Sequence, residues 1–194
     1  YAKIIDPWTV EIKKNDGGIQ TLTTKNIVVA TGAAPFVPDL PGIKDSGYVT
    51  SDTLWAKFAD KEDAPKKLIV LGGGPIGCEL AQAFSRLGSD ITQVELAPRL
   101  MGREDADVAE YAESVLRESG VNVLTSHKAL RFEHKDGVKV LIAEKEGHEL
   151  AIEYDEVIVA VGRKARLTGF GLEDLGIQFD RTIETDEYLQ TLMP

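Results

Sequence analysis

KLIVLGGGPIGCELAQAFSRLGSDITQVEL, residues 67–96, is the stretch that decides the fold of this chain. The apolar run at residues 67–72 is typical of a buried strand. Pro75 suits the start of a helix, because the N–H that proline lacks would have no acceptor within the helix at that position. Apolar side chains then recur at helical spacing until Gly88, a residue typical of a helix end. Residues 90–95 predict a second buried strand, so the stretch as a whole predicts a β-α-β unit.

The turn between the first strand and the helix carries the pattern G-x-G-x-x-G at Gly72, Gly74 and Gly77. Gly72 permits a tight turn, Gly74 lets a pyrophosphate approach the backbone, and Gly77 lets the helix pack close to the strand. The N-terminus of the helix offers free N–H groups and partial positive charge to phosphates. The alternative is a glycine turn with a structural role alone, but the strand before it and the helix after it favour a dinucleotide-binding loop.

An acidic residue follows at the position that contacts the adenosine ribose in such sites. Glu95 ends the second predicted strand, near the spacing of about 20 residues past the glycines that is typical of the ribose-binding acid. A carboxylate there accepts hydrogen bonds from the ribose hydroxyls and repels a 2′-phosphate, so the sequence favours NAD(H) over NADP(H). Leu96 and Ala97 offer no cation for that phosphate, whereas Arg99 and Arg103 keep NADP(H) open as an alternative.

The rest of the chain predicts further strands and helices around this unit. Before it, the sequence predicts strands at residues 8–12 and 19–23 joined by a turn at 15–18, a buried strand at 26–32, an extended proline-rich connection at 33–42, and a short helix at 52–58 capped by Ser51. After it, the sequence predicts a helix at 104–119, a strand at 121–125, an antiparallel meander at 129–134, 138–143 and 148–152, and a buried strand at 156–162. The predicted fold class is α/β, a doubly wound parallel sheet of the Rossmann-like NAD(P)-binding type (βαβαβ plus the meander), with flanking pieces of another domain.

Composition limits the partners. The chain has 32 acidic and 22 basic residues and a net charge of −10, which argues against nucleic acid or an anionic membrane surface. No run approaches the ~18 apolar residues of a membrane helix. The single cysteine, Cys78, indicates a reducing compartment, so we expect a cytoplasmic protein, and the three histidines show no metal-ligand spacing, so we expect no metal site. Because the chain lacks an initiator methionine and ends without a polar tail, we expect it to be a piece of a larger protein.

Three stretches together resemble a known family. IVVATGAAPFVPDLPGI, VLGGGPIGCELAQAFSRLGSDITQVE, and DEVIVAVGRKA with GLEDLGI follow the order found in the flavoprotein pyridine nucleotide-disulfide oxidoreductases, in the branch of mercuric reductase and dihydrolipoamide dehydrogenase. The resemblance implies that residues 1–64 are the late part of a first FAD-domain segment and a linker, 65–165 an NAD(P)H-binding domain, and 166–194 the start of a returning FAD segment. It also implies that an FAD-binding glycine loop, a redox cysteine pair and a C-terminal domain that forms a homodimer lie outside this chain.

The resemblance assigns roles to residues around the glycine loop. Glu79 matches a family glutamate close to where nicotinamide meets flavin and is the candidate catalytic residue; its alternative role is an acid in the first helical turn, stabilised by the helix dipole. Pro75 stands where glutathione reductases carry a tyrosine over the flavin, and with Ile76 it completes the predicted nucleotide-binding turn. Gly162 would let the backbone pass close to the nicotinamide.

Other residues receive roles in the same way. Thr31 and Gly32 resemble the segment beside the bound flavin. Arg163 would contact the nucleotide or the FAD domain, or be solvated. Because the family's redox cysteines form a pair that this chain does not contain, we expect Cys78 to be a buried packing residue.

The sequence therefore predicts the NADH-binding portion of an FAD-dependent oxidoreductase, inactive by itself. In the intact protein, hydride would pass from NADH to FAD and on to a disulfide, a dithiol or another terminal electron acceptor, whose identity the sequence does not indicate. Two alternatives stay open: an NADH oxidase or NADH:acceptor flavoprotein without a redox disulfide, and a non-catalytic nucleotide-binding module.

Overall fold

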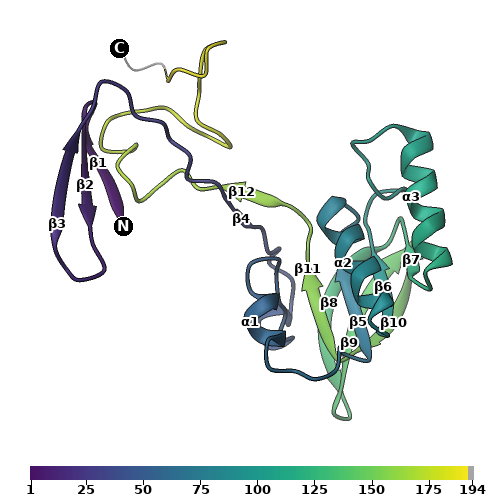
Figure 1. Ribbon diagram of the computed structural model, residues 1–194. Helices are drawn as coiled ribbons and strands as arrows, with labels where there is room; N and C mark the ends of the chain where they lie inside the picture. The colour runs from purple at the N-terminus through teal and green to yellow at the C-terminus, as the bar shows by residue number, and fades with distance from the viewer. Residues whose placement is uncertain (192–194) are drawn as a thin grey trace. The chain divides into compact units, whose positions relative to one another are not determined.

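The computed structural model describes residues 1–191, which fall into two compact units (Figure 1). The larger unit comprises residues 35–163, and the smaller one comprises residues 1–34 together with the segment from residue 164 onward. The larger unit reaches back to Pro35 because the segment before residue 65 packs with it: Val49 extends its sheet by a parallel bridge to Ile158. The assignment of the segments to FAD- and NAD(P)H-binding domains stays a prediction.

The larger unit contains a parallel and an antiparallel sheet. The parallel sheet has the order β11-β5-β6-β7, with β5 Lys67–Leu71, β6 Asp90–Val94, β7 Asn122–Leu124 and β11 Glu156–Val159. The antiparallel sheet has the order β10-β9-β8, with β8 Lys128–Lys135, β9 Val138–Lys145 and β10 His148–Tyr154. The helices are η1 Ile43–Asp45, α1 Leu54–Phe58, α2 Pro75–Arg86 and α3 Ala106–Glu118. The predicted parallel sheet with its antiparallel meander is confirmed.

Both faces of the parallel sheet are covered. Successive side chains of a strand point to opposite faces, so Leu68 and Val70 of β5 pack in one cluster with α2 and α3, whereas Ile69 and Leu71 pack in a second cluster with β8–β10. Figure 1 shows α2 and α3 beside the parallel strands. The unit therefore has three layers: helices, parallel sheet and meander.

The helix boundaries follow local chemistry. Pro75 is the first residue of α2, and Gly88, with a φ of +92°, follows its end as predicted. The predicted cap at Ser51 is wrong: residues 51–53 form a turn in which the Thr53 hydroxyl accepts the Thr50 N–H at 2.9 Å, so α1 begins only at Leu54.

The smaller unit contains the predicted hairpin, one strand before it that the sequence did not predict, and parts of two further unpredicted strands. β1 Ala2–Asp6, β2 Thr9–Lys13 and β3 Ile19–Thr23 form an antiparallel sheet in that order. β4 Ala33–Pro35 and β12 Arg163–Ala165, in which the unit boundaries fall, pair with each other.

The predicted buried strand at residues 26–32 is wrong. These residues form no strand, and Val28 is 88% exposed. An apolar run becomes a buried strand only where neighbouring strands complete its hydrogen bonds, and no strand within residues 1–191 pairs with this run.

No helix within the described residues has both the length and the apolar character needed to span a bilayer.

Candidate dinucleotide-binding site

The glycine loop lies where the strand order of the parallel sheet reverses. The strand that follows β5 in sequence, β6, pairs on one side of it, and β11 pairs on the other. Open α/β sheets bind ligands in the crevice outside the carboxyl ends of the strands at such a switch point. Gly72 follows β5 directly with a φ of +118°, and a Cβ there would lie only 2.5 Å from the Ala160 carbonyl oxygen, just beyond β11. Only glycine fits at this position, where the backbone of residue 72 passes close to the backbone of residue 160.

The other two glycines of the pattern differ in the space around them: Gly77 is closely packed and Gly74 is not. A Cβ on Gly77 would lie 2.3 Å from the Gly72 carbonyl oxygen, so Gly77 is what allows α2 to approach the loop. A Cβ on Gly74 would meet nothing within 4 Å, so this face of the loop is open. The N–H groups of Gly74, Ile76 and Gly77 have no acceptor among residues 1–191. Open space beside free N–H groups at a helix N-terminus suits an anion.

Glu95 is fixed to the same loop. Its Oε2 accepts the Gly73 N–H at 2.5 Å, and its Oε1 accepts the Ala97 N–H at 2.6 Å. A carboxylate has about four acceptor positions, so these bonds leave room for ribose hydroxyls. Sequence reasoning missed Gly73, which occupies a variable position of the pattern. A Cβ on Gly73 would lie 2.8 Å from Glu95 Cγ and 2.7 Å from Leu100 Cδ2, so Gly73 is what lets Glu95 reach the loop.

The segment after Glu95 packs on the glycine loop as well. Met101 donates its N–H to the Gly73 carbonyl at 2.7 Å, and the side chain of Leu100 is fully buried. Arg99 donates through Nη2 to the carbonyls of Gly102 and Glu104, at 3.2 and 2.9 Å. Arg99, one of the two arginines that left NADP(H) binding as an alternative, therefore makes hydrogen bonds within its own loop.

Cys78 lies beneath this loop. It is 6% exposed, its thiol donates to the Gly73 carbonyl at 3.5 Å, and the side-chain amide of Gln93 lies 3.6 Å from its sulfur. Burial raises the pKa of the Cys78 thiol, which favours the protonated and unreactive form. These contacts agree with the packing role expected for Cys78.

Comparisons with known proteins support the resemblance. The sequence profile of the pyridine nucleotide-disulphide oxidoreductases matches residues 2–194. This chain belongs to the pyridine nucleotide-disulphide oxidoreductase family. The family predicted from the sequence is thereby confirmed.

Relatives of the chain carry oxidoreductase names. A dihydrolipoamide dehydrogenase of Chaetomium thermophilum is 39% identical over 190 residues, covering 94% of this chain and 37% of the relative. A mercuric reductase of Staphylococcus aureus is 33% identical over 192 residues, covering 98% of this chain and 34% of the relative. Among solved structures, the Cu(II) complex of the HOCl-induced flavoprotein disulfide reductase RclA from Escherichia coli superimposes with a TM-score of 0.79 at 29% identity, covering 98% of this chain and 42% of that one. The chain thus spans well under half the length of these family members.

The residues that the family resemblance singled out near the loop have distinct surroundings. Glu79 is exposed on α2, and because the helix begins at Pro75, Glu79 is its fifth residue. The alternative role of an acid in the first helical turn is therefore wrong. Gly162 has a φ of +145°, and its carbonyl accepts the Phe36 N–H at 2.9 Å. Arg163 pairs with Asp52 at 3.1 Å, a contact that the sequence did not predict.

Thr31 and Gly32 belong to the smaller unit. The Thr31 hydroxyl donates to the Arg166 carbonyl at 2.9 Å, and the Gly32 carbonyl accepts the Arg166 N–H at 3.0 Å. Gly32 has a φ of +68°. These bonds connect two distant segments of that unit. The role of both residues beside a flavin stays a prediction.

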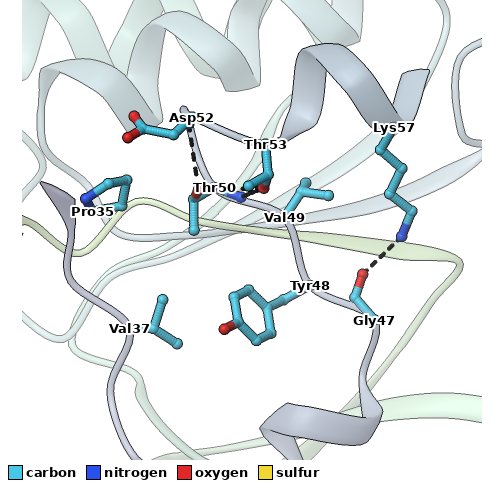
Figure 2. A pocket seen from close by; sticks show the side chains of 9 residues that line it. All are labelled: Pro35, Val37, Gly47, Tyr48, Val49, Thr50, Asp52, Thr53 and Lys57. Carbon is cyan, nitrogen blue, oxygen red and sulfur yellow. Dashed lines mark hydrogen bonds between the residues drawn. The ribbon is translucent and has the colours of Figure 1, made fainter. Parts of the chain in front are cut away.

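The larger unit also contains a hollow of about 560 Å³ whose lining includes no residue of the glycine loop (Figure 2). Its lining residues are Pro35, Val37, Gly47, Tyr48, Val49, Thr50, Asp52, Thr53 and Lys57. Its polar groups bond to one another: Lys57 Nζ donates to the Gly47 carbonyl at 2.7 Å, and Thr50 N–H donates to Thr53 Oγ1. No group of His, Cys, Asp or Glu side chains suited to a metal ion occurs within the described residues. The open space beside free N–H groups lies at the glycine loop, which is therefore the candidate site for a nucleotide.

Proposed function

We propose that residues 35–163 bind NADH within a flavoprotein oxidoreductase that passes hydride from NADH to FAD and on to a disulfide, a dithiol or another acceptor. The observation that carries the proposal is the hydrogen bond between the glycine loop and Glu95. The Glu95 carboxylate accepts the Gly73 N–H, beside the free N–H groups of Gly74, Ile76 and Gly77. The family membership of the chain and the names of its relatives support the redox role.

The surroundings of the loop fit a dinucleotide. The free N–H groups would hold the pyrophosphate, supported by the partial positive charge at the start of α2. Pro75 supplies no N–H but is the first residue of the helix, so the N–H groups of the next two residues belong to its first turn, where they have no acceptor among residues 1–191. Glu95 would accept the ribose hydroxyls with the acceptor positions that Gly73 and Ala97 leave free. A bound nicotinamide supplies the hydride, and the protein supplies its position.

The same arrangement favours NADH over NADPH. A 2′-phosphate would carry its negative charge against the half-buried Glu95 carboxylate, which the Gly73 N–H holds in place. Arg99, one of the nearby cations, donates to backbone carbonyls of its own loop. Like charges brought together are unfavourable, and Arg103 is another nearby cation.

We propose that Glu79 acts where nicotinamide meets flavin. It lies on the exposed face of α2, one turn past the loop, where its carboxylate is accessible to other parts of the protein. In this proposal Gly162 borders the nicotinamide, and Thr31 and Gly32 border the flavin. Because Thr31 and Gly32 already form hydrogen bonds with the Arg166 backbone, they would lie beside the flavin without forming hydrogen bonds to it through those same groups.

The test uses the whole protein that carries this chain. We expect it to purify with bound FAD and to lose its flavin absorbance when NADH is added without oxygen. A colourless protein that binds no FAD would overturn the enzyme function and leave the non-catalytic nucleotide-binding module. Two additional thiols after NADH reduction would support the disulfide route. Flavin reduction without new thiols would favour an NADH oxidase or NADH:acceptor flavoprotein.

A further inference from the structure

We propose that Gln93 is a positioning residue for the nucleotide-binding loop: together with Glu95 it fixes the peptide between Gly72 and Gly73. This inference rests on the proposed function, because its consequence is the affinity for NADH. Gln93 lies in β6, its side chain is 0% exposed, and its Nε2 donates to the Gly72 carbonyl at 3.0 Å. The partner is a carbonyl, so only the amide NH₂ can face it.

Gln93 and Glu95 hold the two ends of one peptide unit. Side chains two residues apart on a strand point to the same face. Here Gln93 bonds to the Gly72 C=O, and Glu95 bonds to the Gly73 N–H. In a trans peptide these two groups share a plane and point in opposite directions, and the chain contains no cis peptide. Two hydrogen bonds, one from β6 and one from the residue that directly follows it, therefore fix the orientation of that plane.

The orientation of this peptide determines what the next residues offer to a ligand. The Gly73 carbonyl also points into the protein, where it accepts the Met101 N–H at 2.7 Å. The Gly74 N–H of that peptide must then point the opposite way, and it has no acceptor among the described residues. Glycine peptides rotate easily because no Cβ restricts them. Without the donor of Gln93, the Gly72–Gly73 peptide could turn and displace the N–H groups that would hold the pyrophosphate.

Among the described residues, the amide of Gln93 has hydrogen-bond partners at its NH₂ group alone. The Oε1 of Gln93 is buried without a partner within residues 1–191, and Ile91, which lies two residues earlier on the same face of β6, is apolar. An unpartnered buried oxygen destabilises the folded state. An apolar side chain of similar size would remove that cost but would leave the buried Gly72 carbonyl without its donor. The amide therefore matters for the loop that its NH₂ group holds.

Gln93→Met tests the inference in the whole protein, because methionine has a similar length but no donor. We expect the Kd for NADH, measured by calorimetry, to rise about fivefold to tenfold, the equivalent of one neutral hydrogen bond. We expect Tm to fall only slightly, because the loss of the donor to the Gly72 carbonyl is partly offset by removal of the unpartnered Oε1. Ser89→Ala is the matched control: Ser89 is 7% exposed, its hydroxyl is also buried without a partner, and it precedes β6 at the end away from the loop. We expect Ser89→Ala to leave the Kd unchanged.

The outcomes separate the inference from the proposed function. A Kd within twofold of the unsubstituted protein for a folded Gln93→Met would overturn the positioning role of Gln93. Absence of NADH binding in the unsubstituted protein would overturn the proposed function itself. If Gln93→Met does not fold, hydrogen exchange of the Gln93 side-chain amide in the unsubstituted protein decides: we expect slower exchange once NADH is bound, and an unchanged rate would overturn the inference.

Discussion

The two compact units differ in how completely they enclose apolar side chains. In residues 35–163, two hydrophobic clusters cover both faces of the parallel sheet. Within the described part of the smaller unit, Ile4 and Leu172 are the buried hydrophobic residues, and the apolar run at residues 26–32 forms no strand. The larger unit contains the neighbours that each of its strands requires, and the smaller unit does not contain them for this run. Sequence patterns predict structure well in the first situation and poorly in the second.

The largest effect is expected where the larger unit tolerates no side chain. In Gly77→Ala, the added Cβ would collide with the Gly72 carbonyl, 2.3 Å away, so α2 must move from the loop. We expect NADH affinity to fall at least about 100-fold and stability by about 3 kcal/mol. Calorimetry and urea unfolding measure the two effects.

Gly17→Ala is the control in the smaller unit. Gly17 has a φ of +85° but open space around it, so only backbone strain of about 1 kcal/mol is expected, with NADH affinity unchanged. Equal effects of the two substitutions on NADH affinity would contradict the difference between the units.

Core truncation sharpens the same comparison. Leu68→Ala removes a side chain that is 1% exposed between β5 and the helices, and we expect a loss of about 2–5 kcal/mol. Val28→Ala, at an exposed position, should change stability by less than about 0.5 kcal/mol. Denaturant unfolding of this chain measures both. A loss above about 1 kcal/mol for Val28→Ala would mean that residues 26–32 form a buried strand after all.

Glu95→Ala tests the acid at the loop. The substitution removes the acceptor of the Gly73 N–H and the proposed ribose contact together. We expect NADH affinity to fall about 10-fold or more, the equivalent of one or two hydrogen bonds to a charged group. NADPH affinity should fall less, because the repulsion of its 2′-phosphate is lost as well. An unchanged ratio of the two Kd values would exclude Glu95 as the residue that discriminates between the nucleotides.

The smallest effect concerns Cys78 and appears at high pH. Burial raises the pKa of the folded thiol above its ordinary value of 9.0, so above about pH 9 the unfolded chain loses a proton that the folded chain keeps. Stability should therefore fall as pH rises past 9, and less so in Cys78→Ala. Tyr154, whose pKa burial raises from 10.0 to about 12, adds to the decline only above pH 10. Urea unfolding at pH 8 and pH 9.5 checks the slope, and identical slopes in both proteins would refute a buried, protonated thiol.

Sequence patterns predicted the parts of the site that depend on local backbone geometry. Gly72, Gly77 and Pro75 each meet a steric or hydrogen-bonding need within a few residues of chain, and each is confirmed in that structural task. Gly73 and Gln93 were missed because their importance arises from contacts between β6 and the loop, which no spacing rule records. The pairing of Arg163 with Asp52 was missed for the same reason: it joins residues far apart in the sequence.

The central claim is that the glycine loop and Glu95 together bind NADH, and a calorimetric titration of the whole protein with NADH and with NADPH tests it most directly. The account predicts binding of NADH at one site per chain, with an affinity at least about tenfold higher than that for NADPH, because the fixed Glu95 carboxylate repels the 2′-phosphate. Equal or tighter binding of NADPH, or no binding of either nucleotide, would contradict it.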